Sequence, residues 1–413
     1  MKNKILPLSL IIGLNSGVFA DTESVENPYA DRLTGDWGGA RTELSEAGIE
    51  FFAYYNTITS SIASGGISKD TNFAGDLFTG FNFDLEKILG WDDTIFTLTG
   101  IDRHGSDITP NIGSQYSAMQ LVGGQNTFLY NVTLEKLFAD GDLSLKLGRM
   151  TATDDFVGSP FYSYSLSNAV NGQIRAVLFD GVMTSYPFAV WGGRMKAKLS
   201  EESTLQVGVF QLTQEMWDRE KQGLDFSIDS DDGVSVFVQY DWTPEINGKP
   251  ARFYAGVNQT FSFEMNDFNS MDTTDSLTRF YAHADYQFYR ESADSDEGLT
   301  LFMTFAYTSQ DEVAIVPVQS TIGAHYKGLL PGRPDDRTVF FATYGGFSDE
   351  YSDGLEAGGG SPVDYEMVFE LGHRIQLTEY AYIQPDIQFI KNPGGSGDID
   401  DAIVVGAQIG FSF

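Results

Sequence analysis

The last twelve residues, AIVVGAQIGFSF, alternate strictly between two kinds of side chain. In an extended strand, one face would carry Val405, Ala407, Ile409, Phe411 and Phe413, and the other would carry Gly406, Gln408, Gly410 and Ser412. A period of two is the period of a β-strand, because successive side chains point to opposite faces. The segment therefore predicts a strand with one apolar face and one face suited to water.

The same alternation recurs along the chain, at residues 204–212, 233–242, 251–261, 279–290, 299–307, 365–373 and 382–390. A soluble β-sandwich would alternate in the same way. The polar faces, however, hold acidic residues in mid-segment and almost no lysine; these acids are Asp241, Asp285, Glu366, Glu370 and Asp386. Since a soluble exterior normally mixes both signs of charge, the pattern favours a barrel whose polar face is inside.

Segments of about 9 to 11 residues, separated by Gly, Asn, Asp or Pro turns, number about 16 to 18 in this sequence. The fold class predicted is all-β: a transmembrane antiparallel up-and-down β-barrel of about 16 strands over residues 49–413. A barrel of that size encloses a water-filled bore. The final strand would close it, and the terminal Phe413 resembles the aromatic ending by which the barrel-assembly machinery recognises its substrates.

The start of the chain has a different pattern. Lys2 and Lys4 precede an apolar run, and Val18-Phe19-Ala20 forms a small-residue cleavage site. Residues 1–20 are therefore predicted to be a secretory signal peptide. A retained anchor is the alternative, but the run has roughly half of the ~20 residues that a spanning helix needs. Cleavage would leave an N-terminal periplasmic segment, residues 21–48, and the loss of two lysines would change the net charge from −33 to −35.

Composition narrows the class of exported protein. The absence of cysteine rules out disulfides, and the four histidines are scattered in a way that does not suit a zinc site. Nucleic acid is not an expected partner of so acidic a chain, and no cofactor is expected. An aromatic content of 14% with 44 glycines is typical of outer-membrane barrels. The predicted location is the outer membrane of a Gram-negative bacterium, with its lipid as a partner.

Four strings go beyond general barrel character: LTGDWGGARTELSEAGI (33–49), LGRMTATDDF (147–156), LLPGRPDD (329–336) and YIQPDIQFIKNPGG (382–395). They resemble the carbohydrate-selective porin family, the OprB-like porins, and the likeness extends from about Leu33 to Phe413. The resemblance implies a sixteen-stranded outer-membrane barrel through which sugars diffuse down their gradient, without cofactor or energy input. The family's ligand contacts lie outside these strings.

The first and last strings also make structural predictions. Gly38 and Gly39 permit a tight turn, and ARTELSEA has the composition of a helix that Gly48 would end. We expect a short periplasmic helix that braces the barrel end. In the last string, Pro385 removes one ladder donor, as at a bulge or local defect. The pore wall there would carry Tyr382, Gln384, Asp386 and Gln388, either contacting sugar hydroxyls or hydrogen-bonding one another.

A constriction is predicted from the second string and the residues after it. Strict alternation after Leu147 would send Arg149 toward lipid, where a charge costs ~2 to 4 kcal/mol, so a bulge re-aims it or the strand ends there. Residues 151–177 are long and poorly periodic, which suits a loop folded into the bore. Its constriction would be built from Arg149, Arg175, Asp154, Asp155, Tyr162 and Tyr164, with Arg103 as a further candidate. The same side chains could instead form salt bridges that pin the loop.

Acidic connections such as FSIDSDDG (226–233) and ESADSDEG (291–298) are expected to be solvated loops, since they lack the closing Glu of a calcium loop. The function predicted is passive diffusion of mono- and small oligosaccharides into the periplasm. One alternative is a general or cation-preferring porin, since the negative net charge would favour the passage of cations. An outer-membrane hydrolase is less favoured because G-x-S-x-G is absent, and an adhesive barrel would have fewer strands. Monomer and homotrimer remain open.

Overall fold

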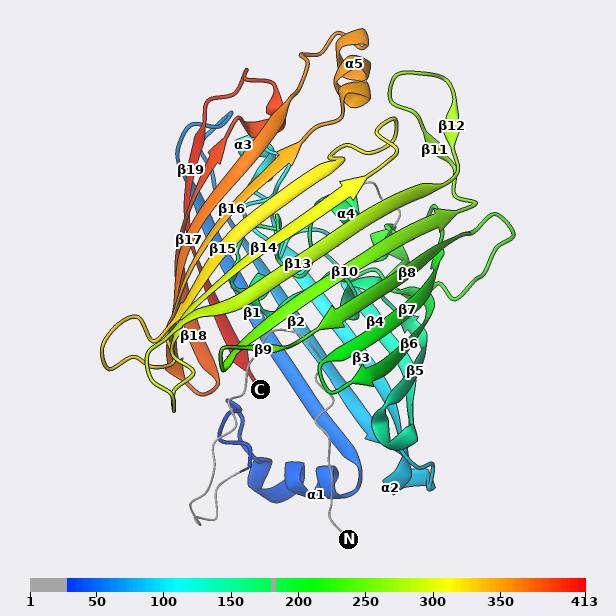
Figure 1. Ribbon diagram of the computed structural model, residues 1–413, viewed down its shortest axis with the longest axis vertical. Coiled ribbons are helices and arrows are strands. Elements are labelled where there is room, and N and C mark those ends of the chain that lie inside the picture. Colours follow the sequence, from blue (N-terminus) through cyan, green and yellow to red (C-terminus); the bar gives the residue numbers. More distant parts are fainter. Residues whose placement is uncertain (1–27, 180–182) are drawn as a thin grey trace.

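The computed structural model describes residues 28–179 and 183–413. Sixteen long strands in this part of the chain form one closed barrel, in which every neighbour is antiparallel and β1 (Ile49–Ser64) pairs with β19 (Ala402–Ser412) (Figure 1). The predicted fold class is confirmed, at the lower end of the predicted strand number. The predicted signal peptide, residues 1–20, lies outside the described residues.

The remaining barrel strands follow in chain order as up-and-down neighbours. They are β2 (Thr71–Asp84), β3 (Thr94–Gly105), β4 (Thr127–Phe138), β5 (Leu143–Met150), β6 (Val190–Ser200), β7 (Ser203–Leu212), β8 (Gly233–Trp242), β10 (Lys249–Phe261), β13 (Leu277–Arg290), β14 (Gly298–Thr308), β15 (Val318–Lys327), β16 (Arg337–Gly346), β17 (Tyr365–Thr378) and β18 (Ala381–Lys391). Three two-residue strands lie in connections: β9 (Glu245–Ile246), β11 (Met265–Asn266) and β12 (Thr273–Thr274).

Helices are short and lie in the connections rather than in the barrel wall. They are α1 (Ala40–Glu46), α2 (Leu85–Leu89), α3 (Thr109–Ile112), α4 (Ala176–Phe179) and α5 (Asp349–Ala357), with 3-10 turns at Trp37–Gly39, Ala139–Gly141, Ala152–Asp154, Pro160–Tyr164, Arg219–Lys221 and Pro393–Gly395. None of the helices within residues 28–179 and 183–413 is long and apolar enough to cross a membrane.

The alternation that predicted strands also sets their faces. Along β19, Val404 and Gln408 are buried inside while Val405 is 41% exposed on the outer surface. Register carries this parity around the wall, because Gln408 pairs with Ile58 of β1 and with Gln384 of β18. Each polar face named from the sequence therefore points into the barrel, and each apolar face points outward.

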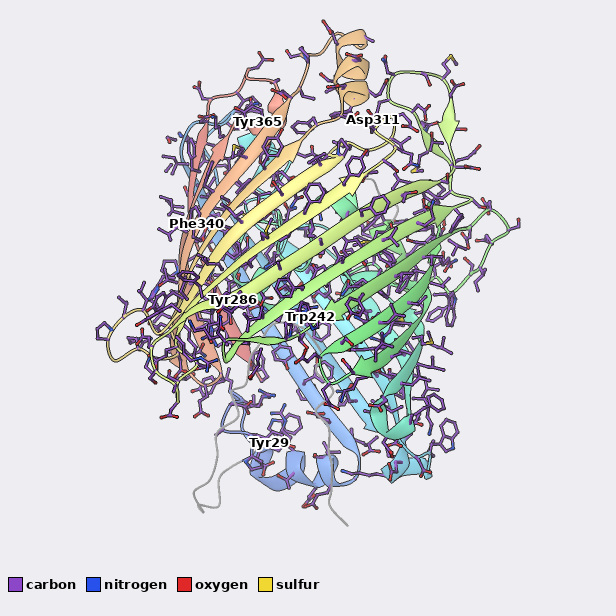
Figure 2. The ribbon with its side chains drawn as sticks, viewed as in Figure 1. Tyr29, Trp242, Tyr286, Asp311, Phe340 and Tyr365 are labelled. Atoms are coloured by element: carbon purple, nitrogen blue, oxygen red, sulfur yellow. The ribbon has the colours of Figure 1, made fainter. Side chains whose placement is uncertain are left out.

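Aromatic side chains lie on the outer surface near both ends of the strands, and Trp242, Tyr286 and Tyr365 are examples labelled in Figure 2. Trp242 and Tyr286 lie toward one end, and Tyr344 and Tyr365 stack near the other. Outer-membrane barrels place such girdles at the two lipid–water interfaces, where an amphipathic ring has one apolar and one wet side. The exterior is that of a membrane-spanning wall.

The two ends of the barrel differ in their connections. α1, α2 and short turns such as residues 243–248 lie at one end, while the longer connections lie at the other (Figure 1). Short turns face the periplasm in outer-membrane barrels. We therefore call the α1 end the periplasmic end and the opposite end the extracellular end.

α1 forms where the sequence predicted it and fastens the barrel seam. Gly48 follows the helix with a positive φ of 89° and donates its N–H to the Ser45 carbonyl at 3.0 Å, as expected of a C′ glycine. Arg41 is fully buried and donates to the carbonyls of Phe51 in β1 and Phe413 at the chain end, at 3.1 and 2.7 Å. The expected bracing role thus has a specific contact between the first and last strands.

Two connections fold into the barrel from the extracellular end. Residues 106–126 are called the first inward segment, and residues 151–179 with 183–189 are called the second. The first packs its apolar side chains against β1, β17, β18 and β19, and the second packs against β7 to β16. The extracellular half of the inner wall is therefore covered by protein. This differs from the expected open bore, because inward aromatics such as Phe237, Tyr281 and Phe341 require apolar partners.

Candidate functional site

The inner wall changes character about halfway along the strands. Toward the extracellular end its inward residues are buried, as at Ala74, Thr260 and Gln319. Toward the periplasmic end inward residues keep solvent contact: Asn82, Glu135, Arg252 and Arg337 are half-buried, and Lys196 is exposed. A solute therefore meets the inward segments first and a wet, charged vestibule afterwards.

The beginning of the second inward segment is fixed by two neighbouring acids. Asp155 receives Lys146 Nζ of β5 at 2.8 Å and Arg194 Nε of β6 at 3.0 Å, and Arg194 also reaches Glu135. Burial tends to raise the pKa of Asp155, but the two cations outweigh it and hold that pKa below its ordinary value. These contacts have the geometry of the pinning salt bridges that the sequence left as an alternative.

Asp154 lies in a different environment one residue earlier. It accepts hydrogen bonds from the hydroxyl of Tyr130 and, at 3.1 Å, from the Asn131 amide, both on β4. Burial raises the pKa of Asp154 above its ordinary value, with Lys146 opposing the shift. Asp154 therefore anchors the segment through hydrogen bonds rather than through a direct ion pair.

Tyr162 is fully buried within the second inward segment. Its hydroxyl lies 2.8 Å from His283 Nδ1 of β13 and 3.1 Å from the hydroxyl of Tyr254 on β10. His283 contacts Asp285 through its other nitrogen at 2.9 Å. The phenol that the sequence placed at a constriction thus joins the segment to the wall, away from solvent.

Tyr164 lies two residues further and is close to two arginines of β16 and β17. Its ring is 4.3 Å from the guanidinium carbon of Arg374 and 5.6 Å from that of Arg337. The ring of Tyr382 also contacts Arg374, at 4.0 Å. The aromatic face expected for a sugar is therefore turned toward guanidinium groups, an arrangement stabilised by cation–π attraction.

The predicted pore-wall residues all point inward, but they contact protein. Gln384 donates to the Tyr164 carbonyl at 2.7 Å and Gln388 donates to the Ala118 carbonyl at 3.0 Å. Asp386 accepts from Gln388 at 3.1 Å. Tyr382 donates to Asn56 at 2.8 Å. These side chains hold the two inward segments, and only the Tyr382–Asn56 end borders the vestibule.

The interruption of the strand ladder that was expected at Pro385 is present. The β17–β18 ladder is interrupted between the pairs Gly372–Asp386 and Ile375–Ile383. In this gap the Arg374 side chain donates to the side-chain oxygen of Gln384 at 2.8 Å. The interruption coincides with Pro385, which has no backbone N–H to donate to the ladder.

Two further acids of β17 bind the backbone of the inward segments, although the sequence marked them only as inward. Glu366 accepts from the backbone N–H groups of Gln115, Tyr116 and Gly394 at 2.8, 3.0 and 2.7 Å. Glu370 accepts from the Ser165 hydroxyl at 2.6 Å and from two backbone N–H groups after it. Their inward parity was the signal available in the sequence.

Arg103 and Arg175 lie near the first inward segment. Arg103 is buried, pairs with Asp76 at 3.0 Å, and donates to the carbonyls of Gln120 and Gly123 at 2.9 and 2.7 Å. Arg175 is half-buried on the second segment, where burial lowers its pKa to about 10, still high enough for it to be charged. Of the predicted constriction residues, Arg175 is placed between the two segments.

Arg149 differs from the expectation. β5 keeps strict alternation, so Arg149 stays on the outer side, opposite Val132 and Trp191. It avoids lipid because the connection of residues 213–232 folds back over it: Arg149 donates to the Asp225 and Ala189 carbonyls and lies 4.9 Å from the Phe226 ring centre. Of the two predicted alternatives, the structure shows no bulge in β5, and the strand ends at Met150, one residue after Arg149, with the guanidinium outside the lumen.

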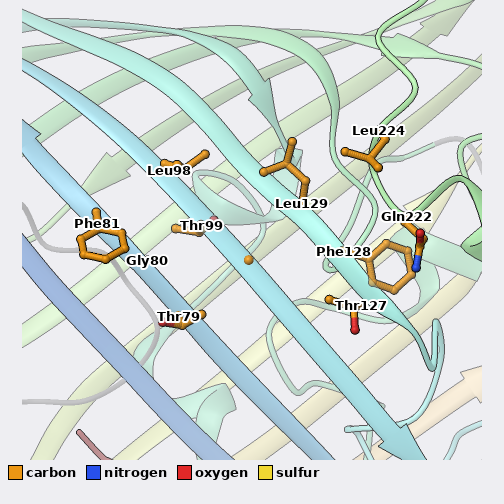
Figure 3. Close-up of a pocket in the computed structure, with 11 residues that line it drawn as sticks. Thr79, Gly80, Phe81, Leu98, Thr99, Thr127, Phe128, Leu129, Gln222 and Leu224 are labelled. Carbon is orange, nitrogen blue, oxygen red and sulfur yellow. The ribbon is translucent and has the colours of Figure 1, made fainter.

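The same connection borders a recess of 390 Å³ on the outer wall (Figure 3). Phe81, Leu98 and Leu129 of the wall and Leu224 of the connection line it. Because these wall side chains are outward by parity, the recess faces lipid and takes no part in the passage. Within residues 28–179 and 183–413, no group of three or more His, Asp or Glu has the arrangement to hold a metal ion.

Comparison with known proteins gives consistent relatives. Residues 68–413 match the family described as carbohydrate-selective porin, OprB family. The chain is 27% identical over 416 residues to the putative porin QuiX of Acinetobacter baylyi, covering 92% of this chain and 93% of that protein. It is 26% identical to Porin B of Pseudomonas aeruginosa, covering 96% and 94%. The high-pH structure of Pseudomonas putida OprB shares the fold, with a TM-score of 0.88, 24% identity and coverage of 95% and 100%.

Proposed function

The chain belongs to the OprB family of carbohydrate-selective porins, and from this membership we propose the route that a sugar takes through it. The protein is an outer-membrane channel for carbohydrates in a Gram-negative bacterium. The route begins at the extracellular loops, passes between the two inward segments, and opens into the periplasmic vestibule. Diffusion along it uses the solute's own gradient.

The observation that carries this route is the change in accessibility of the inner wall. Packed protein covers the inner wall of the extracellular half, and polar residues of the two inward segments that keep solvent contact there include Arg175, Gln120 and Asn171, so the proposed passage runs along them. Below them, the vestibule presents amide, hydroxyl and charged groups. Such groups match sugar hydroxyls, which both donate and accept hydrogen bonds.

Planar bilayers containing the purified chain test the route. Glucose, maltose and larger sugars added to one side should reduce the open-channel current, because a sugar bound at the constriction displaces conducting ions. Arg175→Ala should weaken that block, and Arg149→Ala should not, since Arg149 lies outside the lumen. Current that no sugar reduces would point instead to a general porin, or to a cation-preferring one if the reversal potential follows the cation.

Transport without catalysis is part of the proposal, supported by porin-family membership and the barrel fold. The proposal includes recognition of the C-terminal strand by the barrel-assembly machinery. In the closed barrel, the backbone N–H of Phe413 at the end of this strand donates to the Ala53 carbonyl at 2.9 Å. The mass of the detergent-solubilised protein would distinguish a monomer from a homotrimer.

A further inference from the structure

Three cations lie side by side across neighbouring strands of the vestibule wall. Lys327 of β15 pairs in register with Arg337 of β16, and Arg337 pairs with Arg374 of β17. We call these three residues the basic row. Like charges directly opposite one another on adjacent strands destabilise a sheet, so the row costs the barrel stability unless something else compensates.

Neighbouring acids compensate it incompletely. Lys327 pairs with Asp296 of the turn that follows β13. Arg374 donates to Gln384 and, at 3.0 Å, to the Ser163 carbonyl. Among the described residues, neither Arg337 nor Arg374 forms an ion pair, and the Arg337 side chain makes no hydrogen bond; it contacts the Tyr164 ring. A chain with 58 acidic residues against 25 basic ones has thus left a half-buried arginine without a carboxylate.

The row continues into polar groups that suit hydroxyls. Arg374 stacks on Tyr382, which donates to the side-chain carbonyl oxygen of Asn56 on β1. Asn56 is half-buried, and its Nδ2 group makes no hydrogen bond to the described residues. Across the barrel, Lys196 of β6 is exposed to the same vestibule and also has no ion-pair partner in the described chain. Cationic and amide donors therefore face the lumen from both sides.

We infer that the basic row is the binding site for the carboxylate of an acidic carbohydrate, such as an aldonate or a hexuronate. The planar fork of Arg337 fits a carboxylate through two parallel hydrogen bonds, and the Asn56 amide lies along the wall to bind hydroxyl groups of the same solute. The inference rests on the proposed function, because it names the class of carbohydrate that the same vestibule selects. The carboxylate of the solute would supply the negative charge that no described side chain provides to Arg337.

The acidity of the whole chain does not prevent this. Exposed charges act over a Debye length of about 8 Å at physiological ionic strength. The extracellular acids at residues 229–232 and in α5 are in loops outside the barrel. A carboxylate at the basic row is therefore screened from these loop acids, and the lumen acids Glu135 and Asp241 are already paired with Arg194 and Arg252.

Efflux of radiolabelled gluconate and glucose from liposomes containing the full-length chain tests the inference. The wild type should release gluconate faster than glucose, and Arg337→Gln should lower the ratio of gluconate to glucose flux by about fivefold or more, the change expected from losing roughly 1 kcal/mol or more of binding. Lys391→Gln is the matched control, since it removes the same charge from the exposed end of β18. Arg337→Lys should retain part of the preference because it keeps the charge without the fork.

The outcomes separate the two proposals. Wild-type liposomes that release neither solute would overturn the proposed route itself. Release of glucose without preference for gluconate, or equal loss of both fluxes in Arg337→Gln, would overturn the carboxylate site and leave the row as a hydroxyl donor for neutral sugars. A second measurement needs no variant. If gluconate and glucose at the same concentration reduce the wild-type current equally, the carboxylate site is overturned as well.

Discussion

At the scale of single residues, Asp154 and Asp155 show how neighbouring carboxyls take different roles. Asp155 touches two cations, and its lowered pKa means that it contributes stability above the ordinary range of aspartate, which is lost as the pH falls through the lowered value. Asp154 has a raised pKa, so its contribution is present at low pH and is lost as the pH rises through the raised value. Asp155 therefore gains stability from its negative charge, whereas burial works against the charge of Asp154.

Asp155→Asn should therefore loosen the second inward segment. It would leave Lys146 and Arg194 with a buried charge imbalance, and breaking a buried pair costs ~3 to 5 kcal/mol. We expect a larger single-channel conductance and weaker discrimination between glucose and larger sugars, both measured in planar bilayers. Asp154→Asn is the matched control, since it removes the same charge but breaks no ion pair; its amide oxygen still accepts from Tyr130, and the bond from Asn131 is lost. Equal effects of the two variants would contradict this account.

The contribution of Arg41 to the thermal stability of the barrel can be tested by a single substitution. Arg41→Ala removes donors to the carbonyls of Phe51 and Phe413, two half-buried acceptors, and losing both hydrogen bonds costs about 2 kcal/mol in total. The temperature at which the barrel unfolds, followed by its mobility shift on electrophoresis without prior boiling, should fall. Arg32→Ala should change it little, because within the described residues the Arg32 side chain hydrogen-bonds only to its neighbour Asp31. Sugar flux at room temperature should be retained.

At the scale of elements, β5 is too short to cover β4. β4 residues from Val132 to Phe138 pair with β5, whereas the edge before Val132 meets the connection of residues 213–232 instead. Leu129 donates to the Gln222 carbonyl at 3.0 Å, and Gly223 approaches Leu129 so closely that a Cβ atom would lie 2.0 Å from its carbonyl oxygen. A folded-back loop thus completes a wall that strands alone leave open.

Arg149→Ala tests this completion of the wall. Loss of its bonds to the Asp225 and Ala189 carbonyls should release the connection and expose the β4 edge, so that protease cleaves residues 213–232 of the variant in intact vesicles. Block of the current by sugars should match the wild type. Unchanged protease resistance together with altered sugar block would place Arg149 in the passage after all.

Strands could be predicted from the sequence because alternation is a local signal. Val405 and Gln408 show their faces without reference to any other segment, and Gly48 marks its helix end in the same way. The inward segments could not be predicted beyond residues 151–177, because their position depends on Glu366 and Glu370, some 200 residues away. The inward aromatics Phe237 and Phe341 were a readable sign that the extracellular half would be packed.

The candidate site residues were predictable to the same extent, because local alternation gives the face of a residue but not its distant contacts. Parity alone placed Gln384, Asp386 and Gln388 on the inner face, but could not say that loop carbonyls would cover two of them. Arg337 and Arg374 lie on inward positions of their strands and were missed because they belong to no recognised motif. Their importance depends on the register between strands, which brings like charges together and which no single segment encodes.

At the scale of the whole molecule, charge is sorted by position rather than averaged. Acidic residues dominate the loops, whereas the periplasmic half of the lumen has Lys196, Arg252 and the basic row facing Glu135, Asp241 and Asp285. Net charge therefore describes the field that a solute meets outside the barrel and not the field inside it. The two fields can be told apart because salt screens them over different distances.

Ion selectivity should consequently change with ionic strength. At about 1 M salt the Debye length is about 3 Å, so the loop acids are screened and the lumen cations should give a preference for chloride. At about 0.01 M it is about 30 Å, and the loops should shift the reversal potential toward the cation. Replacing the exposed acids Asp229 and Asp231 by asparagine should reduce the low-salt shift and leave the high-salt value unchanged, because both lie in the extracellular connection before β8. Cation preference that persists at about 1 M salt would mean that the lumen, and not the loops, carries the dominant negative charge.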